Sequence, residues 1–572
     1  MTATSDRSGN PAAEPRTPGS IAFSGRARGP GPLMWAQRLL WNDCQWMGEE
    51  AHYFNMALSV PVPDGLSYDE VMDVLSRVVH RHEAFRSCIT LAADGEPLQE
   101  VAASGTLPVL LAEAAEGAVD EVAARCREEL SGRSFDLLEE WPARLCVVAV
   151  RGMPAKVVMV LSHVFADGGA TRVLSQELAE AMSGPVPPAS WAVPAPQPLD
   201  RAAHEQSAAG QRLSARSLER LERQLRTMPQ TMFPGPRLTP GAHRFKRLEM
   251  RSPALTEALR RIAGRDGTTT SNVLLAATAL MLGVFTGHRR VAFKTILGNR
   301  SFPDLKRIVS SAVSNGLVCA DLADGTFTGL VHSVAQATRA DLLRSQCDPA
   351  ERERLTARVN DERGVHLDLS SFFNDIRVFM GERSAGPDDS ADLDALASRT
   401  RLAWIGEWDR QDAKFFFHAR TLGDCDHVYA MIDTAFMPAE SAERLMRGLE
   451  RVLITSAGAD LPLSELRGLV AADGCRPPDR GEDWALVDHC WVHLPDVVSL
   501  LSGLLPGRRV EAGAGEGENG PVLAARVFCD EPVDVAELRR AAHRALPDYP
   551  GAMVPALLTV LPAGGTAEGS PA

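Results

Sequence analysis

A buried strand, a short polar turn and a helix follow one another between residues 156 and 182, and this order constrains the fold more than any other feature. Residues 156–161 form an apolar, β-branched run that suits a buried strand. The turn is 162–168, with the sequence SHVFADG. It combines a titratable base, a carboxylate and a flexible glycine. The helix that follows is predicted from apolar residues at helical spacing: Val173, Leu174, Leu178 and Met182.

Length and composition predict a globular protein with more than one lobe. The chain has 572 residues, more than one hydrophobic core usually supports, and 45% of them are hydrophobic. With 60 basic and 74 acidic residues the net charge is −14, which argues against an extended nucleic-acid surface. The 10 cysteines include no C-x-x-C pair and no Cys/His cluster at zinc-finger spacing, so we expect reduced thiols and no metal site.

Apolar patterning predicts a cytoplasmic protein that does not enter a membrane. No run approaches about 18 apolar residues, the length of a membrane-spanning helix. Residues 1–31 are rich in Gly, Pro, Ser and Arg and lack an apolar segment, so they are predicted to be a disordered leader rather than a signal peptide. The first ordered segment is expected near Pro32. Proline-rich connectors at 184–198 and 229–241 flank a charged helix at 212–226 and separate two halves.

Several short motifs occur in a fixed order along these halves. They are Ala36-Gln37-Arg38-Leu39, Arg81 to Ser87 (RHEAFRS), Phe135-Asp136-Leu137 with Pro142-Ala143-Arg144-Leu145, the turn 162–168, Asn299-Arg300 and Val313-Ser314-Asn315. In this order they resemble the motifs of the condensation-domain superfamily of nonribosomal peptide synthetases, whose fold is related to chloramphenicol acetyltransferase. The turn fits the pattern H-H-x-x-x-D-G, and Arg81 to Ser87 fits R-H-E-x-L-R-T. The resemblance covers about residues 32–468.

The resemblance implies an α/β fold of two chloramphenicol acetyltransferase-like sandwich lobes that form a V. The N-lobe is expected at 32–185, a linker with a connecting helix at 186–242, and the C-lobe at 243–468. A small α+β domain is expected after them.

The same resemblance implies an acyltransferase. In that family a carrier protein presents an acyl or aminoacyl thioester on a phosphopantetheine arm, and an amine or alcohol attacks the thioester carbonyl. The sequence therefore predicts a free-standing condensation enzyme that forms an amide or an ester in natural-product biosynthesis, antibiotics included. We expect a carrier protein in trans and a small-molecule acceptor as its partners. The chain itself is expected to bind no cofactor.

His163 is the predicted catalytic residue. Its unperturbed pKa of roughly 6.5 lets the neutral ring accept a proton from the acceptor, or orient it. The alternative is a satisfied histidine at a strand end. Ser162 stands where the family has a first histidine, and Ser162 and Asn315 are candidates for the lining of the substrate channel.

Asp167 and Gly168 are expected to support the site. Asp167 is predicted either to cap the following helix or to hold the loop by pairing with an arginine. By family resemblance Arg81 is the first candidate for that partner and Arg86 the second. Gly168 is expected to permit a backbone conformation, or a close approach of substrate, that a Cβ would obstruct.

The C-terminal part resembles a second family. Residues 480–563 resemble the small subdomain of adenylation enzymes, with Leu546-Pro547-Asp548-Tyr549 and Met553-Val554-Pro555-Ala556 as the matching segments. That family expects a lysine shortly afterwards, and here no lysine follows Lys414. We therefore expect a non-adenylating accessory module that docks a carrier or an adenylation partner, followed by a disordered tail at 564–572.

Two other functions remain open from sequence. The replacement of the first histidine by Ser162 and the degenerate module favour a non-catalytic condensation-like scaffold or docking protein. An acyltransferase that uses a coenzyme A thioester is the third alternative. Intact His163, Asp167 and Gly168 favour the condensation enzyme.

Overall fold

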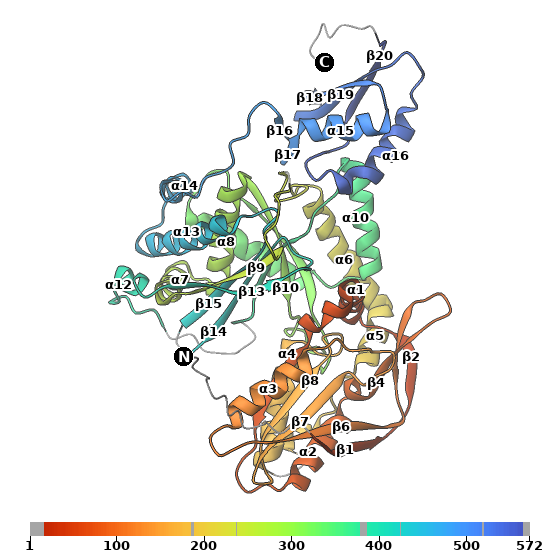
Figure 1. Ribbon diagram of the computed structural model, residues 1–572, viewed down its shortest axis with the longest axis vertical. Coiled ribbons are helices and arrows are strands. Elements are labelled where there is room, and N and C mark those ends of the chain that lie inside the picture. The colour runs from red at the N-terminus through yellow and green to blue at the C-terminus, as the bar shows by residue number, and fades with distance from the viewer. Residues whose placement is uncertain are drawn as a thin grey trace, which may run out of the picture. The chain divides into compact units, whose positions relative to one another are not determined.

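The computed structural model of the chain describes residues 16–184, 188–235, 237–377, 386–423, 425–517 and 520–563. They fold into two compact units, Met1–Gln211 with Gly298–Ser314, and Arg212–Leu297 with Asn315–Ala572 (Figure 1). Helices and strands alternate in both units, and the predicted α/β class is confirmed.

The first unit begins with a strand and runs through the predicted turn into a helix. Its elements are β1 (Arg16–Ser24), β2 (Arg28–Pro32), α1 (Trp35–Met47), η1 (Gly48–Phe54), β3 (Met56–Pro61), α2 (Tyr68–Arg81), η2 (Glu83–Arg86), β4 (Ser87–Leu91), β5 (Pro97–Val101), β6 (Ser104–Glu113), α3 (Val119–Ser131), β7 (Ala143–Val150), β8 (Met153–Leu161), α4 (Gly168–Ser183), η3 (Ala189–Ala192) and α5 (Pro198–Gln206).

The main sheet of this unit is covered on both faces. Its described strands have the order β1-β6-β7-β8-β3, and β2, β5 and β4 form a smaller sheet. Successive side chains of a strand point to opposite faces, so Leu145 and Val147 pack toward α2 and α4, whereas Cys146 and Val148 pack toward α3. This double burial explains why β7 and β8 are apolar along almost their whole length. Between them, Arg151 and Gly152 take positive φ angles of 53° and 77°, as a two-residue hairpin requires.

The predicted disordered leader is wrong for the residues that the structure describes. β1 pairs with β6 from Arg16↔Leu111 to Ser24↔Ser104, and β2 pairs with β5. Ile21 and Phe23 alternate into the core and are only 3% exposed. Pairing with an existing sheet edge satisfies the backbone whatever the composition, which is why a segment rich in glycine and proline becomes ordered here. Residues 1–15 and 564–572 lie outside the described residues.

The second unit is built on a larger mixed sheet whose described strands have the order β11-β10-β12-β14-β15-β9-β13. Its elements are α6 (Ala208–Leu225), which begins in the first unit, β9 (Phe245–Arg251), α7 (Pro253–Asp266), α8 (Thr270–Thr286), β10 (Arg290–Leu297), β11 (Ser314–Asp321), α9 (Phe327–Leu343), α10 (Pro349–Arg363), β12 (Ser371–Asp375), α12 (Leu393–Ala397), β13 (Arg401–Trp408), β14 (Phe415–Leu422), β15 (Cys425–Asp433), α13 (Ala439–Gly458) and α14 (Leu463–Ala472). Helices α7, α8, α9 and α13 share one apolar core with this sheet.

One segment departs from the expected domain boundaries. Gly298–Ser314 lies between β10 and β11 of the second unit, yet it belongs to the first unit. We call it the strap. Its residues Leu305, Ile308 and Ala312 are buried in one small core with Met34 of the first unit.

The C-terminal module is a small α+β fold, as predicted. It comprises β16 (Trp484–Val487), β17 (Cys490–His493), α15 (Leu494–Leu504), β18 (Arg509–Gly517), β19 (Gly520–Phe528), α16 (Val535–Ala545), η4 (Leu546–Asp548) and β20 (Leu557–Leu561). Its apolar core continues into α6 and α10 through Leu221 and Leu355. The side chain of Arg480 donates to the carbonyl of Thr286, the last residue of α8, at 2.7 Å and stacks on Trp491. The module therefore shares a core with the rest of the second unit and is not joined to it by a linker alone.

Within the described ranges, no helix taken singly combines the length and the apolar character needed to cross a bilayer. The bent pair of α7 and α8 meets those criteria only when its two helices are counted together.

The shared core predicts that the module unfolds together with the second unit. Leu501→Ala, at a fully buried side chain of α15, should lower the free energy of unfolding by about 2–5 kcal/mol, because it removes apolar contacts and leaves a cavity. The matched control Leu486→Ala, whose side chain is 46% exposed in the same module, should change it by less than about 0.5 kcal/mol. Calorimetry should show the L501A effect on the transition of the second unit. A separate early transition for the module would contradict the shared core.

Candidate active site around His163

The turn that carries His163 is held by its neighbours in the core. β8 ends at Leu161, and the backbone N–H of Phe165 donates to the carbonyl of Ser162 at 3.0 Å. Val164, Phe165 and Ala166 are all fully buried. Three consecutive apolar anchors leave the half-buried His163 at a defined position at the end of the strand.

A hydrogen bond selects the tautomer of His163. Its Nδ1 lies 2.7 Å from the carbonyl oxygen of Ala166. A carbonyl only accepts, so Nδ1 carries the proton and Nε2 is left with a free lone pair. Burial lowers the pKa of His163 from its usual value, although the Ala166 carbonyl and the charge of Asp167 oppose this effect. The ring is therefore neutral near pH 7 and can accept a proton at Nε2.

Asp167 combines the two structural roles that the sequence left open. It is the N-cap of α4, with Oδ1 accepting from the backbone N–H of Ala170 at 2.8 Å. The same oxygen pairs with the guanidinium of Arg300, and Oδ2 accepts from the backbone N–H of Ala312 at 2.9 Å. Asp167 is 1% exposed, so its charge is buried but fully partnered.

The predicted arginine partners of Asp167 are wrong. Arg81 donates to Glu177 Oε1 (3.3 Å) and to the carbonyl of Val193 (3.0 Å). Arg86 donates to the carbonyl of Ala102 at 3.2 Å. Both side chains stabilise the helix-to-strand region after α2, whereas the partners of Asp167 in the described part of the chain are Ala170, Arg300 and Ala312. The order of motifs along the chain does not determine which of several arginines pairs with a given carboxylate in the fold.

Arg300 is the partner that sequence reasoning missed. Besides Asp167, its guanidinium donates to three carbonyls of the strap, those of Leu305 (2.9 Å), Ile308 (2.6 Å) and Ser310 (3.0 Å). It therefore shapes the strap and attaches it to the start of α4. The available signal was the dipeptide Asn299-Arg300, whose Asn299 has a φ of 52° and donates to Ala312 O at 2.7 Å.

The glycine that the packing requires is Gly169. A Cβ at Gly169 would lie 2.3 Å from Arg300 Nε, whereas a Cβ at Gly168 would meet nothing within 4 Å. Gly168 is also absent from the described residues with positive φ. The expected backbone role for Gly168 is therefore wrong, and only the expected close approach of substrate remains.

A second buried carboxylate fixes the middle of α4. Glu177, 1% exposed, accepts from His82 Nε2 (2.7 Å) and from Arg307 of the strap (3.0 Å). Burial lowers the pKa of His82 despite this contact, so His82 is a neutral donor to an ionised Glu177. The pKa of Glu177 is lowered because hydrogen bonding by His82 and the charge of Arg81 outweigh its burial. This agrees with a structural role for the Arg81–Ser87 motif.

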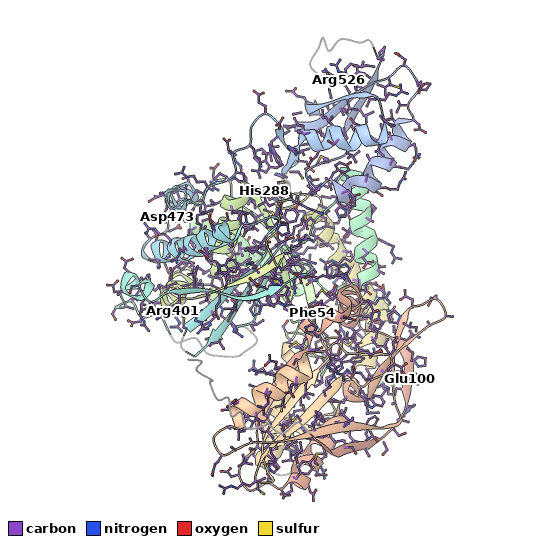
Figure 2. All side chains as sticks on the ribbon, in the orientation of Figure 1. Phe54, Glu100, His288, Arg401, Asp473 and Arg526 are labelled. Atoms are coloured by element: carbon purple, nitrogen blue, oxygen red, sulfur yellow. The ribbon has the colours of Figure 1, made fainter. Side chains whose placement is uncertain are left out.

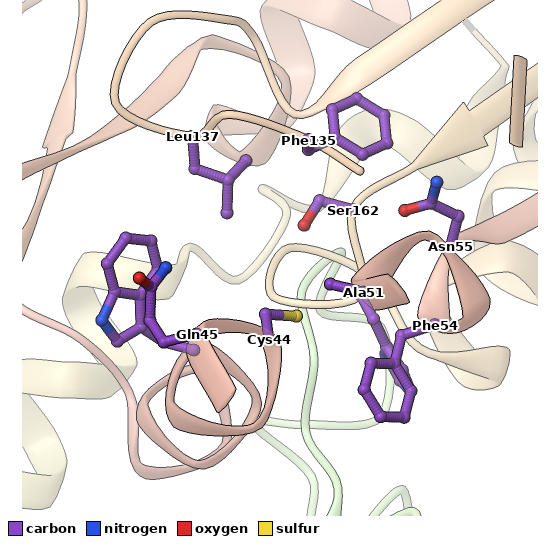
Figure 3. Close-up of a pocket in the computed structure, with 10 residues that line it drawn as sticks. Cys44, Gln45, Ala51, Phe54, Asn55, Phe135, Leu137 and Ser162 are labelled. Atoms are coloured by element: carbon purple, nitrogen blue, oxygen red, sulfur yellow. The ribbon is translucent and has the colours of Figure 1, made fainter. Parts of the chain in front are cut away.

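A pocket of about 320 Å³, counting its open mouth, adjoins the turn (Figure 3). Figure 3 shows the hydroxyl of Ser162 directed into it. The ring of Phe54, which ends η1 (Figure 2), lies 6.5 Å from the ring of His163, centroid to centroid. The lining carries no formally charged side chain among the described residues: Trp41, Cys44, Gln45, Ala51, Phe54, Asn55, Phe135, Leu137, Ser162 and His163. Apart from Ser162 and His163, sequence reasoning named none of these as site residues.

Asn315 belongs to the second unit, at the start of β11, and its carbonyl accepts from Arg352 at 2.7 Å. Its place in a substrate channel stays a prediction. Throughout the described ranges, no group of three or more His, Cys, Asp or Glu side chains is placed to hold a metal ion.

Comparisons with known proteins point to one family. A family model described as "Condensation domain" matches residues 28–367. Phosphinothricin tripeptide synthetase PhsC of Streptomyces viridochromogenes is 25% identical over 334 residues, which is 57% of this chain and 30% of the relative. Isonitrile lipopeptide synthase of Mycobacterium tuberculosis is 29% identical over 319 residues, 53% of this chain and 12% of the relative. The chain thus spans less than a third of either relative.

Solved structures show the same fold at lower identity. The condensation domain from Monacolin K polyketide synthase MokA matches with a TM-score of 0.59 and 15% identity, over 77% of this chain and 100% of that one. SgcC5 protein from Streptomyces globisporus matches with a TM-score of 0.56 and 17% identity, over 75% of this chain and 100% of that one.

The two neighbouring glycines provide a matched test of the strap anchor. Gly169→Ala should lower the free energy of unfolding by about 1–3 kcal/mol, because the new Cβ displaces a guanidinium fixed by several hydrogen bonds. Gly168→Ala should change it by less than about 0.5 kcal/mol. Denaturant unfolding measures both. Equal stability of the two variants would argue that Arg300 does not hold the strap as described.

Proposed function

Because the chain belongs to the condensation-domain family, we propose that it is a condensation enzyme that joins a carrier-bound acyl or aminoacyl thioester to an amine or hydroxyl acceptor. Condensation domains are amide-forming acyltransferases that work with carrier-bound substrates. For this chain we propose a carrier protein in trans, with the phosphopantetheine arm on that partner, and a product of natural-product biosynthesis.

The observation that carries this proposal is the free lone pair on Nε2 of a neutral His163 at the pocket. In the proposed step the acceptor nitrogen or oxygen forms a bond to the thioester carbonyl carbon while Nε2 takes its proton. The tetrahedral intermediate then breaks its carbon–sulfur bond, and the thiolate of the arm receives the proton from Nε2. Protons balance, and the residue returns to its starting state.

Asp167 and Arg300 act in this scheme by position. They hold the turn and the start of α4, so that Ala166 O stays aimed at Nδ1 and the tautomer does not change. Ser162 leaves a hydroxyl, rather than a second imidazole, in the pocket wall, and His163 is then the base without a second histidine among the described lining residues.

For the C-terminal module we propose an accessory role in docking a carrier or an adenylation partner. Its resemblance to the small adenylation subdomain stays a prediction, since the matched family model ends at residue 367. Its continuous core with α6 and α10 would give such a partner a fixed platform.

Replacing the base should abolish most of the turnover. His163→Ala, incubated with an acyl-loaded carrier protein and candidate amines and alcohols, should form product about 10²- to 10⁴-fold more slowly than the unmodified protein. The matched control His332→Ala changes an exposed histidine of α9 in the second unit and should leave turnover unchanged. Mass spectrometry of the product measures both.

Each contrary result would favour a different function or mechanism. Equal product from H163A and the unmodified protein would remove His163 from the mechanism. Binding of the carrier without turnover by either protein would favour the scaffold, and turnover with a coenzyme A thioester but not with a carrier would favour the third alternative.

The pH dependence follows from the lowered pKa of His163. The imidazolium form has no lone pair on Nε2, so kcat/KM with a hydroxyl acceptor should fall as the pH drops through a midpoint below 6.5, and stay level above it. An amine acceptor should add a second limb at its own pKa. Initial rates between about pH 5 and 8.5, with the unfolding temperature followed in parallel, measure this. A midpoint clearly above 6.5 would contradict a desolvated, neutral base.

A further inference from the structure

Helix α1 receives part of its N-terminal cap from another helix. The N-cap residue Met34 offers no oxygen on its side chain, and Gln37 of α1 accepts the backbone N–H of Met34 at 2.9 Å but not that of Trp35. Instead, Oε2 of Glu205 in α5 accepts the backbone N–H of Trp35, the first residue of α1, at 2.7 Å. A carboxylate at this position satisfies an otherwise orphaned donor and faces the positive end of the helix dipole.

Glu205 also connects α1 to the strap. Its other oxygen, Oε1, accepts from Arg201 Nε at 2.9 Å, and the guanidinium of Arg201 pairs in turn with Asp304 of the strap. The side chains of Arg201 and Glu205 are 5% and 4% exposed, whereas that of Asp304 is 49% exposed. These contacts form a series that we call the relay. It links the solvent-accessible Asp304 through the buried Arg201 to the buried Glu205 at the start of α1.

This arrangement is costly for a purely structural contact. Burial raises the pKa of Glu205 to about 7, although the charge of Arg201 opposes the rise. Buried ion pairs can often be replaced by apolar side chains of similar volume without loss of stability. Retaining one at the start of α1 is reasonable where directional contacts are needed to fix the helix in place.

The far half of α1 forms a wall of the pocket. Trp41 and Cys44 line it together with His163, and Cys44 lies about 13 Å along the helix from Trp35 at 1.5 Å per residue. A shift of the helix at Glu205 therefore reaches the pocket wall directly. Misplacement by about 1 Å near reacting groups can cost a factor of about 10² in rate.

We propose that Glu205 is a positioning residue, which fixes α1 through Arg201 and Asp304 to the strap so that the wall formed by Trp41 and Cys44 keeps its place beside His163. The strap then holds both sides of the pocket. It reaches the His163 turn through Arg300 and Asp167, and α1 through Asp304, Arg201 and Glu205. The inference rests on the proposed function only in taking this pocket as the reacting site.

The test uses the thiol of Cys44 as a reporter that needs no turnover. Burial raises the pKa of Cys44 to about 12, so its alkylation by iodoacetamide should be slow in the folded protein. Glu205→Ala should raise the labelling rate of Cys44 about tenfold or more relative to Cys88, a half-buried cysteine of β4 in the same unit. Peptide mapping by mass spectrometry resolves the two sites in the full chain.

Matched variants separate positioning from general loosening. Glu205→Gln keeps an acceptor for Trp35 and should label within about twofold of the unmodified protein. Glu96→Ala removes an exposed ion pair of the same helix, that with Arg38, and should have no effect. Asp304→Ala changes the exposed end of the relay and should raise Cys44 labelling even if Glu205→Ala fails to fold.

Kinetics supply the second readout. Glu205→Ala should lower kcat more than it raises KM, with recovery in Glu205→Gln, whereas a merely structural loss would lower the active fraction and leave KM unchanged. Unchanged Cys44 labelling in folded Glu205→Ala and Asp304→Ala would overturn the inference. Faster labelling in a protein that shows no condensation turnover would leave the inference standing and count against the proposed function.

Discussion

The buried carboxylate of Asp167 joins the parts on which the site depends. It accepts from the N-terminus of α4, from the guanidinium of Arg300 and from the backbone of Ala312. A buried charge without these partners would cost several kcal/mol, so the turn, the helix and the strap are stable only together. Because the guanidinium of Arg300 also donates to three carbonyls of the strap, the same interaction determines the path of a segment 133 residues further along the chain.

The anchored Asp167 constrains His163 through the peptide group of Ala166. Ala166 precedes the anchored Asp167, and its carbonyl fixes Nδ1 of His163 as a donor. A neighbouring carboxylate would ordinarily favour the imidazolium, yet burial dominates and lowers the pKa of His163. The carboxylate is engaged by Arg300 and two backbone N–H groups, so its influence on the ring is geometric more than electrostatic. The structure thus holds a neutral imidazole, with Nδ1 as the donor to Ala166, in the lining of the pocket.

Local patterns allowed the strand, the turn and the helix around His163 to be predicted, because burial and capping act over a few residues. The cap at Asp167 is such a case. The partner of Asp167 could not be predicted, because several arginines had suitable chemistry and only the path of the strap brings Arg300 to the carboxylate. The prediction that residues 16–31 are disordered was wrong for a related reason. Their composition is that of a disordered segment, but the edge of β6 supplies backbone partners that composition cannot reveal. The condensation family, predicted from motif order, is confirmed by the family match.

The remaining choice between an enzyme and a scaffold turns on what a scaffold would need. A docking protein requires the anchors of the fold, which are Asp167, Arg300 and Glu177, but it has no use for a desolvated histidine with an unprotonated nitrogen. Such a group costs free energy of solvation, and an apolar side chain would fill the same place more cheaply. Ser162 removes a second imidazole without disturbing the Nδ1 contact of His163. His163 is retained beside a pocket with an uncharged lining although its burial costs solvation free energy. This favours proton transfer by His163 over docking alone.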